Sequence, residues 1–538
     1  MSRWQREVGV ICYGLTAVLM VWCQGRADAA QRPHIVLVLC DDLGYGDLSC
    51  LNPQGKIPTP NFDRVAREGM IFTDAHAGSA VCTPTRYGLL TGRYAWRTSL
   101  QRGVLGGLSP LLVEPGRLTL ASLLKQHGYR TACVGKWHLG LNWQVLSGKS
   151  ISPLAIESRE QVFNVDYSQP FTAGPLTVGF DEYFGISGSL DMVPYTFLRN
   201  DRVEALPTED RSFPLMLGKQ PQSRQGPTAP GFEIEHVLST FTRYAVEFIE
   251  RQVAAHQPFF LYLAYASPHT PIVPHPAWRG RSGLNYYGDF VMETDAALGA
   301  VLEALDRTGC ASQTWVIVTS DNGCSPQADY PALLARGHNP SHVFRGTKAD
   351  IYEGGHRVPF LVRWPGVIAP GGRSARLICL TDVLATLADV LGHPLPDEAA
   401  EDSVSFWPTL RGNEQPPRTA VVHHSIDGSF AIRQGPWKLA LCPGSGGWSA
   451  PAPGRHDTSM LPAVQLFHLD QDIGEQHNLQ AEHPQHVAEL TQLLTEFVAR
   501  GRSTPGKPQA NAVAVDIFQA GQAAHRPLSK KNKSAPTR

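Results

Sequence analysis

The fold is decided by one short stretch, which reads HIVLVL at residues 34–39 and continues as CDD at residues 40–42. Its apolar residues run without alternation, which is typical of a central strand buried on both faces. Further strands are predicted at residues 131–134, 259–266, 315–319 and 359–362, with helices at 119–126, 239–253 and 289–306. Strands that alternate with helices favour an α/β fold, in which a mostly parallel sheet is sandwiched by helices.

The pattern changes near residue 421. Short strands at 421–422, 430–433, 437–441 and 464–469 indicate a small antiparallel sheet, and residues 486–499 predict a closing helix. We therefore expect a main α/β domain over residues 30–415 and a smaller C-terminal antiparallel α+β subdomain over residues 416–501. Residues 502–538 are rich in Gly, Pro, Ala and Lys, and predict a disordered tail.

The charge balance limits the possible partners. The 538-residue chain has a formal net charge of −1, so no global field favours nucleic acid or an anionic membrane. We expect no nucleic-acid partner, and a site for an anionic substrate must be a local cluster of cations. The oligomeric state stays open.

The N-terminus predicts export. Arg3 and Arg6 precede an apolar run at residues 8–23, and Ala27-Asp28-Ala29 resembles a cleavage site, so residues 1–29 are interpreted as a signal peptide. The run is shorter than the roughly 20 residues of a membrane helix, which makes an uncleaved anchor the weaker alternative. The mature chain is expected to be secreted or periplasmic, without a stable membrane anchor. Its eight cysteines show no dense disulfide spacing, so at most one or two bridges are expected.

One cysteine stands before a predicted helix. Residues 82–93 read CTPTRYGLLTGR, in which Thr83 can cap a helix, Pro84 suits its first position and Gly92 can end it. Cys82 would then lie at the helix N-terminus, where free N–H groups stabilise negative charge. The alternative is a buried cysteine before an ordinary helix.

Acidic and amide side chains follow two of the predicted strands. Asp41 and Asp42 come directly after the first strand, and Asp321 and Asn322 follow the strand at 315–319. Open α/β sheets place their sites at these carboxyl ends. Either pair alone would more often be a turn or a helix cap. Together, three carboxylates and an amide oxygen favour Ca²⁺ or Mg²⁺ over zinc.

Basic residues follow other strands. Lys136 and His138, in GKWHLG at residues 135–140, come after the strand at 131–134, and His269 comes after the strand at 259–266. A lysine can hold an anionic oxygen as a point charge, and a histidine can move a proton near neutral pH. Alone, each of these segments would more often be a surface loop or turn.

The pattern Cys82-x-Pro84-x-Arg86, followed by LLTGR at residues 89–93, closely resembles the signature of the type I sulfatases of the alkaline phosphatase superfamily. The likeness runs in order from Ile35 to Leu479, and Thr85 departs from it because many members have Ser there. The resemblance implies an alkaline-phosphatase-like fold and sulfate ester hydrolysis by the domain at residues 30–415. It also implies that a formylglycine-generating or equivalent maturation enzyme oxidises Cys82 to formylglycine, whose hydrate is the nucleophile.

The resemblance also assigns the site. It implies Ca²⁺ held by Asp41, Asp42, Asp321 and Asn322, in contact with the modified Cys82. In this interpretation Asp321 accepts the nucleophile's proton, His269 protonates the leaving oxygen, and His138 takes the proton that releases sulfate. The remaining expected site residues are those that contact sulfate or position the diol: Lys136, Lys348, Ser189 and Arg86.

The substrate is less defined by the sequence. Residues 189–191, 268–271 and 337–340 resemble sulfatases that act on sulfated sugars, which favours a sulfated carbohydrate, including a hexose 6-sulfate, over a small aryl sulfate. Pocket walls are expected from the loops at 141–175 and 190–230. A phosphatase or phosphonate monoester hydrolase of the same superfamily, and a non-catalytic glycan-binding homologue, are the alternatives. We place four further histidines on exposed loops or edge strands: His342, His356, His423 and His424. Zinc ligation by the pair His423-His424 is disfavoured by the poor ligand spacing.

Overall fold

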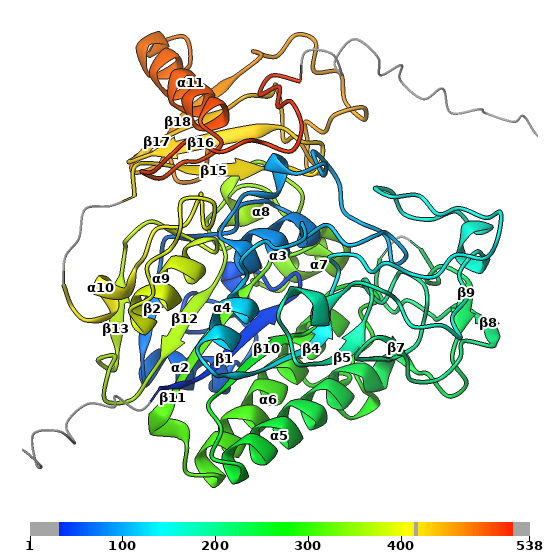
Figure 1. Ribbon diagram of the computed structural model, residues 1–538. Coiled ribbons are helices and arrows are strands. Elements are labelled where there is room, and N and C mark those ends of the chain that lie inside the picture. The colour runs from blue at the N-terminus through cyan, green and yellow to red at the C-terminus, as the bar shows by residue number, and fades with distance from the viewer. Residues whose placement is uncertain (1–31, 219, 414–417, 520–538) are drawn as a thin grey trace, which may run out of the picture.

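A ten-stranded sheet forms the centre of the computed structural model, which describes residues 32–218, 220–413 and 418–519. The strand order is β13-β2-β12-β11-β1-β10-β4-β5-β6-β7 (Figure 1). Its five middle strands are parallel: β11 (Thr314–Ser320), β1 (His34–Cys40), β10 (Phe259–Ala264), β4 (Arg130–Lys136) and β5 (Glu182–Ile186). The outer strands are β12 (Phe360–Arg363), β2 (Met70–Phe72), β13 (Gly372–Ser374), β6 (Leu198–Arg199) and β7 (Arg202–Val203). The prediction of a mixed, mostly parallel sheet is confirmed.

Strand β1 is buried on both faces, as its continuous apolar run predicts. Val36 and Val38 pack into the core that the sheet forms with three helices: α2 (Pro60–Arg67), α5 (Val237–Ala254) and α6 (Tyr286–Arg307). Leu37 and Leu39 point to the other face of the strand and pack into a second core with three other helices: α3 (Cys82–Thr91), α4 (Leu120–Gln126) and α9 (Asp382–Leu391). Burying each such side chain contributes about 1.5–3 kcal/mol, so this strand fixes the position of both helical layers.

The two predicted helix starts have different outcomes. Thr119 caps α4 by accepting a hydrogen bond from the Ser122 amide, as the sequence indicates. The predicted cap at Thr83 is wrong: α3 begins at Cys82, after the extended residue Val81. The Thr83 hydroxyl instead accepts from the Leu105 amide at 3.2 Å, so a contact to a distant loop replaces the local cap.

The C-terminal strands form a separate antiparallel sheet, at the top of Figure 1. It consists of β15 (Val421–His424), β16 (Phe430–Gln434), β17 (Trp437–Ala440) and β18 (Gln465–His468), covered by α11 (Pro484–Ala499). Residues 502–519, expected to be disordered, lie against the main domain: Arg93 donates to the Ala510 carbonyl, and Arg502 is buried. Their composition disfavours regular elements but does not prevent packing. Short elements complete the described fold: β3 (Ala75–His76), β8 (Glu209–Arg211), β9 (Gly226–Thr228), β14 (Ile378–Cys379), α7 (Tyr330–Ala335), α8 (Glu353–His356) and α10 (Trp407–Leu410).

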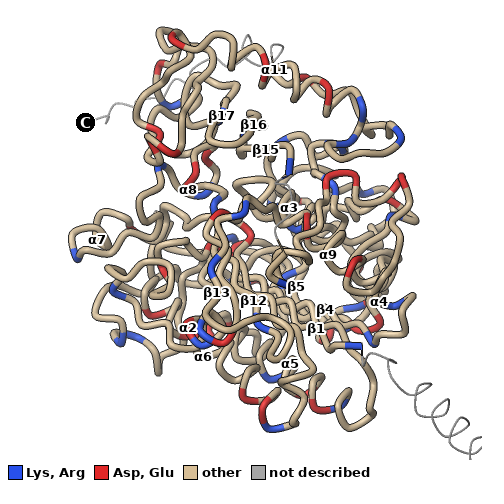
Figure 2. Tube along the Cα trace, turned by 90° about the vertical axis from the view of Figure 1, so that its left-hand side faces the viewer, with Lys and Arg blue, Asp and Glu red and all other residues tan. Residues whose placement is uncertain are grey.

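Surface charges of both signs are interspersed along the chain in Figure 2. Among the described residues, no helix combines the length and the apolar character needed to cross a membrane. The eight cysteines that the structure describes are all free thiols. The predicted signal peptide and residues 520–538 of the predicted tail lie outside the described residues.

A buried ion network joins the C-terminal sheet to the main domain. The Lys438 ammonium, on β17, lies 3.0 Å from Glu353 Oε1 and 2.8 Å from Glu475 Oε1, and all three side chains are fully buried. It also lies 3.1 Å from His356 Nε2. Burial alone would raise the pKa of Glu353, but the cation on Lys438 and neighbouring His76 hold it well below its usual range. Lys438 therefore compensates Glu353 together with Arg357, which lies 3.2 Å from Glu353 Oε2, and it is the cation in contact with Glu475.

We predict that Lys438→Met destabilises the protein by about 3–5 kcal/mol, because two buried carboxylates lose their shared cation. Thermal unfolding followed by circular dichroism measures the effect. Lys125→Met is the matched control, since Lys125 pairs with Asp181 near the surface and should cost less than about 1 kcal/mol. Equal losses in the two variants would contradict a stabilising role for the buried network.

Candidate active site

The predicted acidic residues meet at the carboxyl ends of β1 and β11. Cys40 and Ser320 are register partners at the ends of these parallel strands, so Asp41 and Asp321 continue side by side. The Asp42 amide donates to Asp321 Oδ1 at 3.2 Å, and Asn322 Nδ2 donates to Asp42 Oδ1 at 2.7 Å. The four side chains that the sequence assigns to a metal therefore form one fully buried group.

Cys82 opens α3 directly against this group. Its Sγ lies 3.5 Å from Asp41 Oδ1 and 3.5 Å from the Lys348 ammonium. Burial, reinforced by the charge on Asp321, raises the pKa of the Cys82 thiol. A thiol with a raised pKa is a weak nucleophile at neutral pH, so the unmodified side chain is poorly suited to attack.

Three permanent cations approach the three carboxylates. Lys136 Nζ lies 2.6 Å from Asp41 Oδ2, and Lys348 Nζ lies 2.6 Å from Asp42 Oδ1. Arg86 donates through Nε and Nη2 to Asp321 Oδ2, at 3.1 and 2.8 Å. The six charges balance, so a bound divalent cation would make the centre net positive and attractive to an anionic ester.

The carboxylates respond differently to this environment. Burial, together with the neighbouring Asp41 charge, raises the pKa of Asp321 to about 6. Burial acts in the same direction on Asp41, but its cationic neighbours, Lys136 and Arg86 among them, hold the pKa of Asp41 well below its usual range. Of these two neighbours, Asp321 is thus the better proton acceptor, because its pKa lies nearer to neutral.

Two histidines, His138 and His269, lie beside the group of carboxylates and cations. His138 Nε2 donates to the Leu105 carbonyl at 2.8 Å, which leaves Nδ1 without a hydrogen-bond partner among the described residues. His269 Nε2 lies 3.7 Å from Asp42 Oδ2. Burial lowers the pKa of His269 to about 3 and that of His138 well below its usual value. Both rings are therefore neutral at pH 7 before an anion binds.

Two residues of the site have left-handed backbones. Asp42 has φ 64° and His138 has φ 54°, although neither is glycine. Such conformations cost about 1–3 kcal/mol and concentrate at functional sites. The tertiary contacts of the site therefore hold both side chains in orientations that the local chain disfavours.

The donor atoms fit a hard cation. Asp42 Oδ2 and Asn322 Oδ1 are buried and accept no hydrogen bond from the described residues. Ligand atoms of Asp41, Asp42, Cys82 and His269 lie within 4.8 Å of one another. Carboxylate and amide oxygens are the ligands of Ca²⁺ and Mg²⁺. The sequence resemblance assigns His269 to catalysis and to substrate binding, and the structure also brings its ring to the edge of this group.

A second group of potential ligands has a different character. His76, Glu353, His356 and His423 bring ligand atoms within 4.8 Å of one another. The Lys438 ammonium already contacts two of these side chains, and a metal ion there would be repelled by it. The group is thus a charge-compensated structural network. The expected placement of His356 on an exposed loop or edge strand is wrong, because it lies in α8 and is fully buried. His423 lies on β15, an edge strand of the C-terminal sheet as expected, and is buried there.

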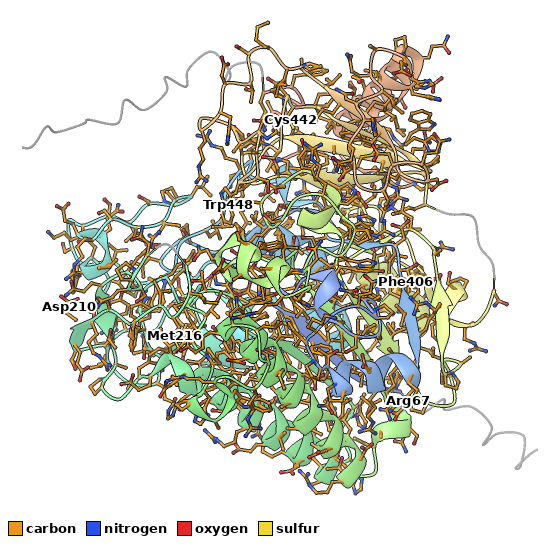
Figure 3. All side chains as sticks on the ribbon, turned by 180° about the vertical axis from the view of Figure 1, so that it is seen from behind. Arg67, Asp210, Met216, Phe406, Cys442 and Trp448 are labelled. Carbon is orange, nitrogen blue, oxygen red and sulfur yellow. The ribbon has the colours of Figure 1, made fainter. Side chains whose placement is uncertain are left out.

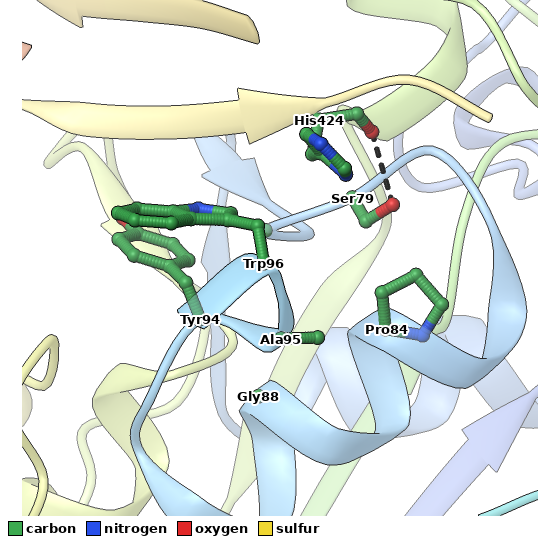
Figure 4. Close-up of a pocket in the computed structure, with 8 residues that line it drawn as sticks. Ser79, Pro84, Gly88, Tyr94, Ala95, Trp96 and His424 are labelled. Carbon is green, nitrogen blue, oxygen red and sulfur yellow. Dashed lines mark hydrogen bonds between the residues drawn. The ribbon is translucent and has the colours of Figure 1, made fainter. Parts of the chain in front are cut away.

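His424 lines a small void between β15 and α3. The void has room for about 10 Å³, the size of one water molecule, between His424, Trp96 and Pro84 (Figure 4). The His424 carbonyl accepts from the Ser79 hydroxyl at 2.9 Å, and burial lowers the pKa of its ring to about 4. His424 lies on the edge strand β15, one of the two placements expected for it, and is buried there. His342 is half-buried beside Tyr45.

Ser189 follows β5, whose end lies next to that of β4. The His138 amide donates to the Ser187 carbonyl at 2.9 Å, which ties the two strand ends together. The Ser189 hydroxyl is buried and has no partner among the described residues, as a ligand-binding group would. Asp191 has one carboxylate oxygen in the same condition, and its charge acts on His269. Sequence analysis missed Asp191, although its place two residues after Ser189 was the available signal.

The class that this sheet and this site define is a hydrolase of anionic esters with an alkaline-phosphatase-like fold. Residues 33–393 match the family model described as Sulfatase. The chain is 33% identical over 510 residues to the N-acetylgalactosamine-6-O-sulfatase of Bacteroides thetaiotaomicron, covering 88% of this chain and 94% of that protein. It is 34% identical over 475 residues to human arylsulfatase A, covering 86% of each.

A solved structure agrees with these sequence relatives. Its description concerns the metabolism of multiple glycosaminoglycans by Bacteroides thetaiotaomicron, and it matches with a TM-score of 0.74 at 32% identity, covering 87% of this chain and 99% of that one. The chain belongs to the sulfatase family and is a sulfuric ester hydrolase.

Proposed function

We propose that this sulfatase removes sulfate from a sulfated carbohydrate, including a hexose 6-sulfate, using Ca²⁺ and a formylglycine made from Cys82. The observation that carries the proposal is the contact of Cys82 with both Asp41 and Lys348, 3.5 Å from each. This contact supports the proposal, because a modifiable side chain then lies beside oxygen atoms that suit a hard cation and beside a lysine that could hold sulfate. The carbohydrate is supported by the N-acetylgalactosamine-6-O-sulfatase that covers 88% of the chain.

The groups that would be added supply the chemistry that amino acids lack. Calcium would polarise the ester, and the formylglycine hydrate would offer one hydroxyl for attack and a second for release of sulfate. Lys136 and Lys348 neutralise the sulfuryl oxygens, and burial of these lysines strengthens that interaction. Arg86 fixes the orientation of Asp321 through two hydrogen bonds to one carboxylate oxygen.

Proton transfer falls to three residues. Asp321, with a pKa of about 6, accepts the proton of the nucleophile. His138 can accept the second proton at Nδ1, the ring nitrogen left free by its bond to Leu105. His269 is neutral in the ligand-free protein, and the negative charge of a bound ester would favour the protonated ring that donates to the leaving oxygen.

We predict that Cys82→Ala loses at least about 1,000-fold in kcat for an aryl sulfate, because the nucleophile is removed. Circular dichroism should show the unchanged fold. In the wild-type protein from its native host, the peptide spanning residues 82–86 should be about 18 Da lighter than the thiol form, as exchange of SH₂ for oxygen requires. Full activity in a protein whose peptide carries the thiol mass would disprove the proposed nucleophile.

Calcium should stabilise the folded protein through the acidic group. We predict that Ca²⁺ at 100 times its Kd raises the stability of the wild type by about 2.7 kcal/mol, and that Asp42→Asn removes most of this gain. Differential scanning calorimetry with and without chelator measures it. Asp457→Asn is the control, since Asp457 is exposed and far along the chain from the site. If Ca²⁺ stabilises the Asp42→Asn variant as much as the wild type, the ion binds at a site other than the one proposed.

We propose that the enzyme acts outside the cytoplasm, as the predicted signal peptide at residues 1–29 suggests, and that it meets its maturation enzyme before or during export. If so, protein recovered from the native host should begin near residue 30 when sequenced from its N-terminus. Recovery of a chain that still starts at Met1, in the cytosolic fraction, would refute the export route.

A further inference from the structure

A cavity of about 240 Å³ lies between the two loops expected to wall the substrate pocket. Glu157 and Arg159 line it from the loop at 141–175, and Met192, Val193 and Arg224 line it from the loop at 190–230. Pockets for drug-sized ligands measure about 300–1,000 Å³, so this one fits a single substituted sugar residue.

The cavity adjoins the catalytic group through two short segments. Met192 and Val193 come three and four residues after Ser189, and the Met192 amide donates to the Ser189 carbonyl at 3.0 Å. On the other side, Glu157 accepts from the Leu108 amide at 2.6 Å, and Leu105 of the same loop accepts from His138. Glu157, which lines the cavity, and His138 thus both bond to the backbone of residues 105–108.

The charges of the lining favour an anion. Glu157 is buried and its carboxylate is engaged by the Leu108 amide. Arg159 pairs with Asp210, which Figure 3 places at the outer edge of the molecule. Arg224 forms no ion pair with the residues that the structure describes, although its charge acts on Glu157. A guanidinium that lines a cavity and forms no ion pair with a described carboxylate can bind an added carboxylate or sulfate in two-point geometry.

We propose that this cavity is a specificity subsite for an anionic sugar residue adjoining the one that carries the cleaved sulfate, with Arg224 as its main anion-binding group. The anion is a carboxylate, as in a uronic acid, or a second sulfate ester, because both offer the same oxygen geometry. The inference rests on the proposed carbohydrate function and extends it from one sugar to two. Arg224 acts on substrate choice and not on the chemical step.

The test compares substrates that differ only in the neighbouring sugar. Kinetics are measured on a hexosamine 6-sulfate alone, and on disaccharides in which it is joined to a uronic acid, a sulfated neutral sugar or an unsubstituted neutral sugar. Arg224→Ala should lower kcat/KM roughly 10- to 100-fold for the anionic disaccharides, mainly through KM. The monosaccharide and an aryl sulfate should be hydrolysed as by the wild type, and Arg224→Lys should recover part of the loss. The relative size of the effect on the two anionic disaccharides distinguishes carboxylate from sulfate.

Arg243→Ala is the matched control, because Arg243 is exposed on α5 and pairs with Glu247 in the same helix. Equal losses on all substrates, or a wild type that does not distinguish anionic from neutral neighbours, would overturn the subsite while leaving the proposed function intact. A wild type without activity on any sulfate ester would instead overturn the proposed function. In that case calorimetric titration of the uronic-acid disaccharide into Cys82→Ala, with and without Arg224→Ala, decides the subsite: binding that needs Arg224 supports it, and binding that does not overturns it.

Discussion

The structure depends on the mutual compensation of three carboxylates and three cations in one water-excluded place. Asp41, Asp42 and Asp321 are fully buried, and each has a cationic group within 2.8 Å. A buried carboxylate without such a partner would cost several kcal/mol. Because the protein charges balance, the chain can fold before it binds an ion. A divalent cation and a singly charged ester then change the total by only one charge.

This compensation requires parts of the chain that are far apart in sequence. Arg86 comes from α3, Lys136 from the end of β4 and Lys348 from the loop before α8. Of these three residues, Lys348 lies in a loop and belongs to no strand of the central sheet. Its loop returns through α8, whose Glu353 is held by Lys438 from the C-terminal sheet. The backbone is equally constrained, since a Cβ on Gly323, next to Asn322, would lie 1.9 Å from the Gly354 carbonyl oxygen. The C-terminal subdomain thus contributes to the site by fixing the segment that carries Lys348, without touching the reacting atoms.

Sequence reasoning succeeded where the physical cause is local. The uninterrupted apolar run of β1 is typical of a strand buried on both faces, and in a parallel sheet the polar residues after β1 and β11 then meet at one edge. It failed where the partner is distant. Thr83 is a residue type that suits a helix cap but bonds to Leu105, and His356 is buried with its Nε2 3.1 Å from the Lys438 ammonium. Residues 502–519 show the same limit, because low apolar content did not reveal that Arg93 and Arg97 would bind their backbone and side chains.

The residues assigned to the reaction and the residues proposed to select the sugar lie on different kinds of structural element. The groups assigned to the reaction are held mainly by parallel strand ends and by the start of a helix, where neighbouring registers leave little freedom, so the class of chemistry can be deduced from residue order. The sugar is met by loops, whose conformations depend on contacts such as Glu157 to Leu108 that no periodicity encodes. The segment from Ser189 to Val193 belongs to both. One end supplies an unpartnered hydroxyl beside the strand end, and the other lines a charged cavity, so a shift that adapts this segment to a new neighbouring sugar would also move Ser189. If the cavity binds the second sugar as proposed, changes within these five consecutive residues would alter both the selectivity for that sugar and the position of Ser189.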